Sequence, residues 1–172
     1  MFLELIATVF AGLAAAGIVL GLNKGLKGRL PKWSLPVAAG AAMLASTISS
    51  EYSWFPRTKS SLPEGLEIVQ TVDGSAFYRP WTLLKPFTER FAALDTVSIS
   101  SHAAQPDMQM ADLYFYGRWA PVSKLAVLAD CATGRRAALA DAIKFHDDGT
   151  VSGAEWVRPD AGDPILTKIC KR

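Results

Sequence analysis

Residues 2–22, FLELIATVFAGLAAAGIVLGL, decide how the chain is organised. Glu4 and Thr8 are the polar residues in this run. A helix of that length rises roughly 30 Å, which is the thickness of the hydrocarbon core of a bilayer. The sequence therefore predicts a membrane-spanning helix over residues 2–22.

A second apolar run, LPVAAGAAMLASTISS, covers residues 35–50 and carries no charge. It is short for a span, but Trp33 precedes it and Trp54 follows it. Tryptophan is typical of the two membrane–water interfaces. We therefore expect residues 1–50 to form a transmembrane helical hairpin with two spans.

The loop between the two runs, residues 23–33, decides the expected orientation. It contains Lys24, Lys27, Arg29 and Lys32 and no acidic residue. Short loops rich in Lys and Arg stay on the cytoplasmic side. The sequence predicts a membrane protein with both termini and its soluble part outside the cytoplasm.

Two alternatives remain open for these runs. The first could be a cleaved signal peptide, since Ala14, Ala15 and Ala16 resemble a cleavage site, but no basic segment precedes the apolar run. The second could be a buried helix of a soluble protein, because short apolar runs are ambiguous. The flanking tryptophans and the basic loop favour the membrane hairpin.

Gly17, Gly21 and Gly25 repeat every four residues along the first run. Such a stripe of small residues lets helix backbones approach closely in a membrane. It could pack inside the hairpin, against alanines 38, 42 and 45, or dock onto another membrane protein. The sequence leaves both interpretations open.

Residues 51–65 are interpreted as a juxtamembrane linker, and residues 66–172 as one extracytoplasmic β-rich domain. Four of the 18 basic residues of the chain lie in the loop 23–33, which leaves this domain close to neutral. A neutral domain has no electrostatic footprint for nucleic acid. The expected partners are other integral membrane protein subunits and the lipid bilayer.

The domain should be an antiparallel sheet followed by a C-terminal helix, which places the whole chain in the α+β class. Asp163 and Pro164 predict the start of that helix, and Ile165 and Ile169 share one face of it. Asp147-Asp148-Gly149 predicts a hairpin turn. Residues 86–94 are expected to form a short helix and residues 101–110 a polar loop. The strands are expected at 66–72, 96–100, 111–119, 123–131, 135–139, 142–146 and 151–157.

The two cysteines, Cys131 and Cys170, both fall in the domain expected outside. An even number of cysteines in an oxidising compartment favours a disulfide. Two free buried thiols are the alternative for a cytoplasmic domain.

The last third of the chain resembles surface-adhesin protein E-like domains of bacteria. The similarity rests on Leu128-Ala129-Asp130-Cys131, Arg135-Arg136, Asp148-Gly149-Thr150-Val151, Trp156, Pro164-Ile165-Leu166 and Ile169-Cys170. It implies a small antiparallel sheet with a helix joined to it by a disulfide. A two-helix anchor stands here in place of that family's lipoprotein signal. The whole chain also resembles uncharacterised two-span membrane proteins of alphaproteobacterial type. This resemblance implies a bacterial inner-membrane protein with its soluble domain in the periplasm.

Candidate chemistry is sparse. His102, Met108 and Met110 lie within one predicted loop, and imidazole and thioether ligands suit copper(I). Methionine is more often a filler of hydrophobic cores. No nucleophile elbow or acid–base pair is recognisable, so neither an enzyme nor a bound cofactor is expected. Seven aromatic residues could form a patch for a partner, although strand alternation would place about half of them in the core. They are Phe77, Tyr78, Trp81, Tyr114, Phe115, Tyr116 and Trp119.

The sequence favours a non-catalytic accessory subunit of a larger integral membrane complex. Respiratory and photosynthetic electron-transfer assemblies are candidate hosts. A membrane-anchored extracytoplasmic binding module is the first alternative, and periplasmic copper delivery is the second.

Overall fold

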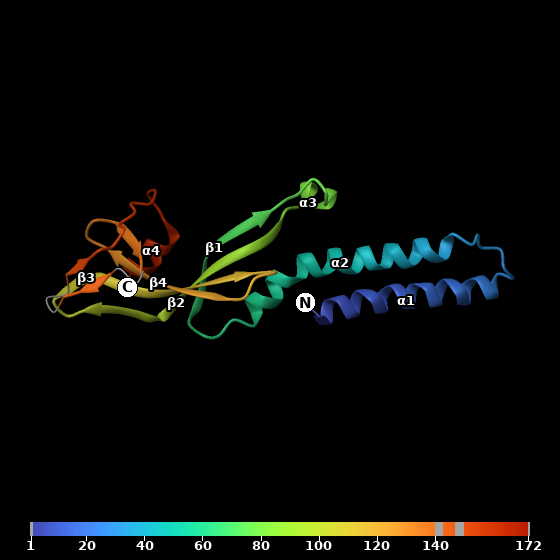
Figure 1. Ribbon diagram of the computed structural model, residues 1–172, viewed down its shortest axis with the longest axis horizontal. Helices are drawn as coiled ribbons and strands as arrows, with labels where there is room; N and C mark the ends of the chain where they lie inside the picture. Colours follow the sequence, from blue (N-terminus) through green and yellow to red (C-terminus); the bar gives the residue numbers. More distant parts are fainter. Residues whose placement is uncertain (1, 140–142, 147–149, 172) are drawn as a thin grey trace. The chain divides into compact units, whose positions relative to one another are not determined.

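A computed structural model describes residues 2–139, 143–146 and 150–171 of the chain. The chain divides into two compact units, Met1–Ser60 and Ser61–Arg172 (Figure 1). The first unit is helical, and the second is an antiparallel sheet with a C-terminal helix. The predicted α+β class is confirmed.

Two long helices, α1 (Phe2–Gly25) and α2 (Ser34–Ser60), pack side by side in the first unit. The tight connection depends on Asn23, whose backbone carbonyl accepts a hydrogen bond from the Gly28 N–H at 2.8 Å. The Asn23 side chain accepts a second bond from the Leu30 N–H at 3.0 Å. Gly28 has a φ of 78°, a conformation that glycine adopts without strain.

The two helices differ in apolar character. Among the described residues, α1 alone is long and apolar enough, by length and composition, to cross a membrane or serve as a signal sequence. Its segment Leu3–Gly25 has a mean hydropathy of 2.4. A second span is not evident, because α2 carries serines and threonine at 46, 47, 49 and 50 and then Glu51. This helix also continues to Ser60, so most of the expected linker is helical.

The second unit is a five-stranded antiparallel meander in which each strand pairs with the next along the chain. Its strands are β1 (Leu66–Gly74), β2 (Phe87–His102), β3 (Gln105–Gly117), β4 (Ser123–Asp130) and β5 (Arg135–Ala138). A short helix, α3 (Pro80–Leu84), connects β1 to β2. The sheet is visibly curled (Figure 1).

The expected short helix at residues 86–94 is wrong, because this segment is the first half of β2. Four successive residues, Phe91 to Leu94, are buried on both faces of the sheet. A strand covered on both faces loses the polar alternation that marks a strand in sequence. The helical spacing of Phe87, Phe91 and Leu94 therefore misled the prediction.

The expected polar loop at 101–110 is also wrong. The chain turns after His102 and re-enters the sheet at Gln105, so most of the segment belongs to β3. The register of β2 against β3 shifts between Asp95 and Ser100. The Asp95 carboxylate accepts from the Val97 N–H at 3.0 Å and holds this irregularity. Such bulges increase the local twist of a sheet.

The C-terminal helix α4 (Pro164–Cys170) was predicted correctly. The Asp163 carboxylate accepts bonds from the N–H groups of Ile165 and Leu166 at 3.0 and 2.9 Å, which caps the helix. Buried Ile165 and Ile169 pack in one hydrophobic core with sheet residues Leu94, Ala111, Leu113, Val127 and Ala129.

The predicted disulfide is confirmed. Cys131, directly after β4, is bonded to Cys170 at the end of α4, with 5.6 Å between the two Cα atoms. The bond joins the helix to the sheet at the edge of the core.

A second, two-stranded sheet is formed by β6 (Lys144–Phe145) and β7 (Val151–Ser152). These strands lie within two segments that the sequence predicted as strands. The predicted turn at Asp147-Asp148-Gly149 lies outside the described residues.

Candidate functional site

The glycine stripe of α1 faces open space within its own unit. A Cβ atom added to Gly17, Gly21 or Gly25 would meet nothing within 4 Å. Gly12 behaves differently, because a Cβ there would lie 2.9 Å from the Cγ of Met43 on α2. The close helix contact inside the hairpin therefore uses Gly12, and the stripe remains available as an outer surface.

A polar strip between α1 and α2 escaped the sequence analysis. The Glu4 carboxylate accepts a hydrogen bond from the Ser50 hydroxyl at 2.7 Å, and the Arg57 guanidinium lies 3.9 Å from it. Ser46, Ser49 and Ser53 line the same strip. A charge in an apolar helix needs such partners. The repeated serines of α2 were the signal for this contact.

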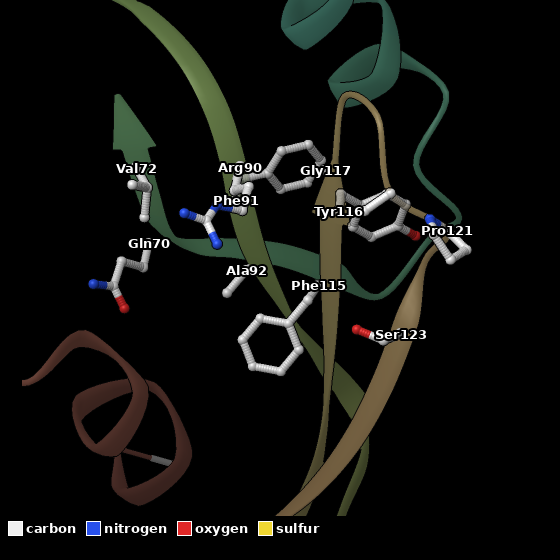
Figure 2. Close-up of a pocket in the computed structure, with 11 residues that line it drawn as sticks. Gln70, Val72, Arg90, Phe91, Ala92, Phe115, Tyr116, Gly117, Pro121 and Ser123 are labelled. Atoms are coloured by element: carbon white, nitrogen blue, oxygen red, sulfur yellow. The ribbon is translucent and has the colours of Figure 1, made fainter. Parts of the chain in front are cut away.

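The sheet domain carries an apolar groove with a volume of about 520 Å³ (Figure 2). One row of paired residues crosses it: Gln70, Ala92, Phe115 and Ser123 from four neighbouring strands. The small side chain of Ala92 and the missing side chain of Gly117 leave the space, and Phe115 and Pro121 flank it. Concave apolar surfaces with a few polar groups are the common form of ligand sites.

The groove continues the sheet face that α4 covers. Leu94 and Leu113 form the pair two residues away from Ala92 and Phe115, on the same face of the sheet, and they pack in the core with α4. Arg90 and Gln70 bring polar groups to the lining (Figure 2). The site therefore combines an apolar floor with one positive charge, which suits a ligand with an apolar body and an anionic or polar end.

The seven aromatic residues singled out in the sequence are distributed over several surfaces. Tyr116 stacks on buried Phe91 with 4.8 Å between the ring centroids, and both Tyr116 and Phe115 line the groove. Phe77 and Tyr78 lie beside α3 and are exposed. Trp119 lies in the turn after β3, where the Arg118 guanidinium is 4.7 Å from its ring centroid. These five residues therefore lie in the groove, beside α3 and in the turn after β3.

The three candidate copper ligands lie on the β2–β3 hairpin. Met108 and Met110 are two positions apart on β3 and share one face of the sheet. The Nδ1 atom of His102 accepts a hydrogen bond from the Ala104 N–H at 3.3 Å, which leaves Nε2 for a metal. The described part of the chain holds no group of three or more His, Cys, Asp or Glu arranged as metal ligands. Copper binding stays a prediction.

Asp130, next to the disulfide, organises the turn between β4 and β5. Its carboxylate accepts from the Ala132 and Thr133 N–H groups, the Thr133 hydroxyl at 2.7 Å and the Arg135 Nε at 2.9 Å. Burial acts to raise the pKa of Asp130, but these bonds from Thr133 and Arg135 hold that pKa below its ordinary value of 3.8. The group has a structural role, because its partners are the turn residues Ala132 and Thr133 and the first residue of β5, Arg135.

No protein-family model, curated protein or solved structure matches the chain. The resemblance to surface-adhesin protein E-like domains therefore stays a prediction.

Proposed function

We propose that the protein is a non-catalytic accessory subunit of a larger integral membrane complex. In this proposal α1 and the first part of α2 both cross the bacterial inner membrane, the basic loop lies in the cytoplasm, and the sheet domain lies in the periplasm. The disulfide supports an oxidising compartment for the domain, since such bonds persist there. Electron-transfer assemblies are one class of host.

The observation that carries the proposal is the open glycine stripe. Gly17, Gly21 and Gly25 present backbone that nothing in the hairpin covers. In a bilayer, apolar side chains are already solvated by lipid, so helix association depends on close packing of small residues. A stripe that is left over after the hairpin has formed fits a helix of a partner subunit.

Co-purification tests the proposal. The intact chain, extracted with a mild detergent, should migrate in native electrophoresis as a complex far larger than 18.5 kDa. Gly21→Leu should release it from the complex, because the larger side chain blocks close approach. Leu20→Phe is the matched control, since Leu20 is exposed and lies about 100° around the helix from Gly21. Migration of the wild type as a monomer alone would refute the proposal.

The orientation is tested separately by labelling single cysteines in intact cells. The native cysteines are both in the disulfide, so an added thiol is the reactive one. An impermeant reagent should label Ser60→Cys and leave Lys32→Cys unlabelled. The reverse pattern would contradict the proposed topology.

The apolar groove supports a second candidate function, a membrane-anchored binding module. A ligand in the groove should be retained by the extracted wild-type chain and lost from Ala92→Trp, which fills the floor. Native mass spectrometry measures the added mass. A binding module would keep its ligand when Gly21→Leu has removed the membrane partner, which separates the two functions.

A further inference from the structure

The connection between β1 and β2, residues 75–86, forms a small protrusion that we call the α3 knob. Four large apolar side chains on it are exposed: Phe77 by 86%, Tyr78 by 65%, Leu83 by 61% and Leu84 by 91%. Exposed apolar residues scattered singly need no explanation, but a concentration within one short connection marks an interaction surface.

Hydrogen bonds within the α3 knob hold its backbone in a defined conformation. The Thr82 side chain is fully buried, accepts a hydrogen bond from the Ala76 N–H at 2.9 Å and donates one to the Arg79 carbonyl at 2.7 Å. The Arg79 N–H donates to the Ala76 carbonyl at 2.9 Å, which closes the turn before α3. These bonds fix the backbone while the apolar side chains point outward. The exposure is therefore a property of an ordered surface.

The charge of the knob has one sign. Residues 75–86 contain Arg79 and Lys85 and no acidic residue. The Arg79 guanidinium lies 5.2 Å from the Tyr78 ring centroid, so a cation and an exposed aromatic ring share one surface.

We propose that the α3 knob inserts its apolar side chains into the interface of the membrane that holds α1, with Arg79 and Lys85 at the level of anionic lipid headgroups. Aromatic and aliphatic residues combined with cations are the composition of membrane-surface segments. Anionic lipids attract such cations. The inference rests on the proposed membrane anchorage of α1.

The length of the chain makes this contact reachable. Only residues 61–65 separate the end of α2 from β1, and five residues span at most about 18 Å. Strand β1 adds about 30 Å before the knob begins. A domain tethered this closely meets the membrane surface at high effective concentration. The composition of the knob, exposed apolar side chains with two cations and no acidic residue in 75–86, favours lipid as the occupant.

Depth measurements with spin labels test the inference on the full chain. Leu84→Cys is labelled in vesicles of phosphatidylcholine mixed with phosphatidylglycerol, and collisions with oxygen and with a water-soluble nickel chelate are compared. Val157→Cys is the control in the sheet domain, because Val157 is exposed but pairs with Arg136 of β5, near the end of the sheet opposite the knob. Leu13→Cys reports on α1 in the same vesicles.

The label at Leu84 should show a several-fold higher ratio of oxygen to nickel collisions than the label at Val157. Arg79→Gln combined with Lys85→Gln should lower the ratio at Leu84 in the mixed vesicles. A ratio at Leu84 equal to that at Val157, with Leu13 protected from nickel, would overturn the inference and leave the anchorage intact. Protection of Leu84 from both reagents would show a protein cover and would also overturn it. Exposure of Leu13 to nickel would instead refute the membrane anchorage.

Discussion

The two units of the chain place their apolar residues in opposite ways. In the sheet domain, Leu94, Leu113 and Ile169 are almost completely buried against one another. In the helical unit, large apolar side chains such as Leu5, Phe10 and Leu13 are mostly exposed. The domain folds around its own core, whereas α1 leaves its apolar side chains exposed and is apolar enough, by length and composition, to cross a membrane or serve as a signal sequence.

Loss of the disulfide should have the largest effect, and only on the sheet domain. Cys131→Ser with Cys170→Ser should lower the free energy of unfolding of the domain by about 3–4 kcal/mol in the chain-entropy account, because the bond closes a loop between residues 39 apart. Urea unfolding followed by tryptophan fluorescence measures it. The helices of the first unit should keep their far-ultraviolet circular dichroism. An unchanged midpoint would mean that α4 is held by its apolar face alone.

A charge on the outer face of α1 should have the next largest effect, and only on the helical unit. Leu13→Arg should disfavour insertion by about 3 kcal/mol, because arginine at the centre of a span is costly. Carbonate extraction of membranes measures the fraction that stays bound. Leu13→Phe is the control and should remain in the membrane. Full retention of the arginine variant would place this face of α1 outside the hydrocarbon.

Gly12 and Gly21 sharpen the comparison within one helix. Gly12→Leu should destabilise the hairpin by about 1–3 kcal/mol, since its new side chain collides with Met43. Gly21→Leu should leave the hairpin as stable as the wild type. Thermal unfolding in detergent, followed by circular dichroism, compares the two. Met43→Ala should restore the stability lost in the Gly12 variant, and equal losses at both glycines would contradict the packing described here.

The smallest expected effect is the pH dependence contributed by Asp130. Its pKa is lowered in the folded state, so its stabilising contribution is present above the unfolded value near 3.8 and is lost as pH falls through the folded pKa. Asp130→Asn should cost about 1–2 kcal/mol at neutral pH and flatten the decline in stability below about pH 4. Urea unfolding at a series of pH values measures both. Parallel curves for wild type and variant would contradict the assignment.

Local signals predicted the elements that local chemistry determines. Asp163 followed by Pro164 marks the start of a helix whatever lies around it, and α4 begins there. The same reasoning failed for residues 86–94, because both faces of β2 are buried at Phe91 to Leu94, which removes the polar alternation of a strand. Propensity is weak evidence where tertiary pairing decides.

The surfaces were less predictable than the elements. The groove depends on Gln70, Ala92, Phe115 and Ser123 becoming neighbours, which follows only from the strand register. The glycine stripe was recognised in the sequence. Whether it packs inside the hairpin or faces outward depends on what lies next to each glycine, which only the structure shows. Glu4 was noted without a partner, because Ser50 reaches it only once the hairpin has formed.

The order of the strands has a consequence for how the domain is made. Each strand of the meander pairs with the one synthesised just before it, so the sheet can grow as the chain emerges. The helix that closes the core comes at the end, and its Lys168 reaches back to Glu67, 101 residues earlier. Until residues 164–170 are made, the face with Leu94, Ala111 and Leu113 has no cover, and the thiol of Cys131 has no partner. A variant that lacks residues 163–172 would therefore leave this apolar face uncovered and the thiol of Cys131 free to react.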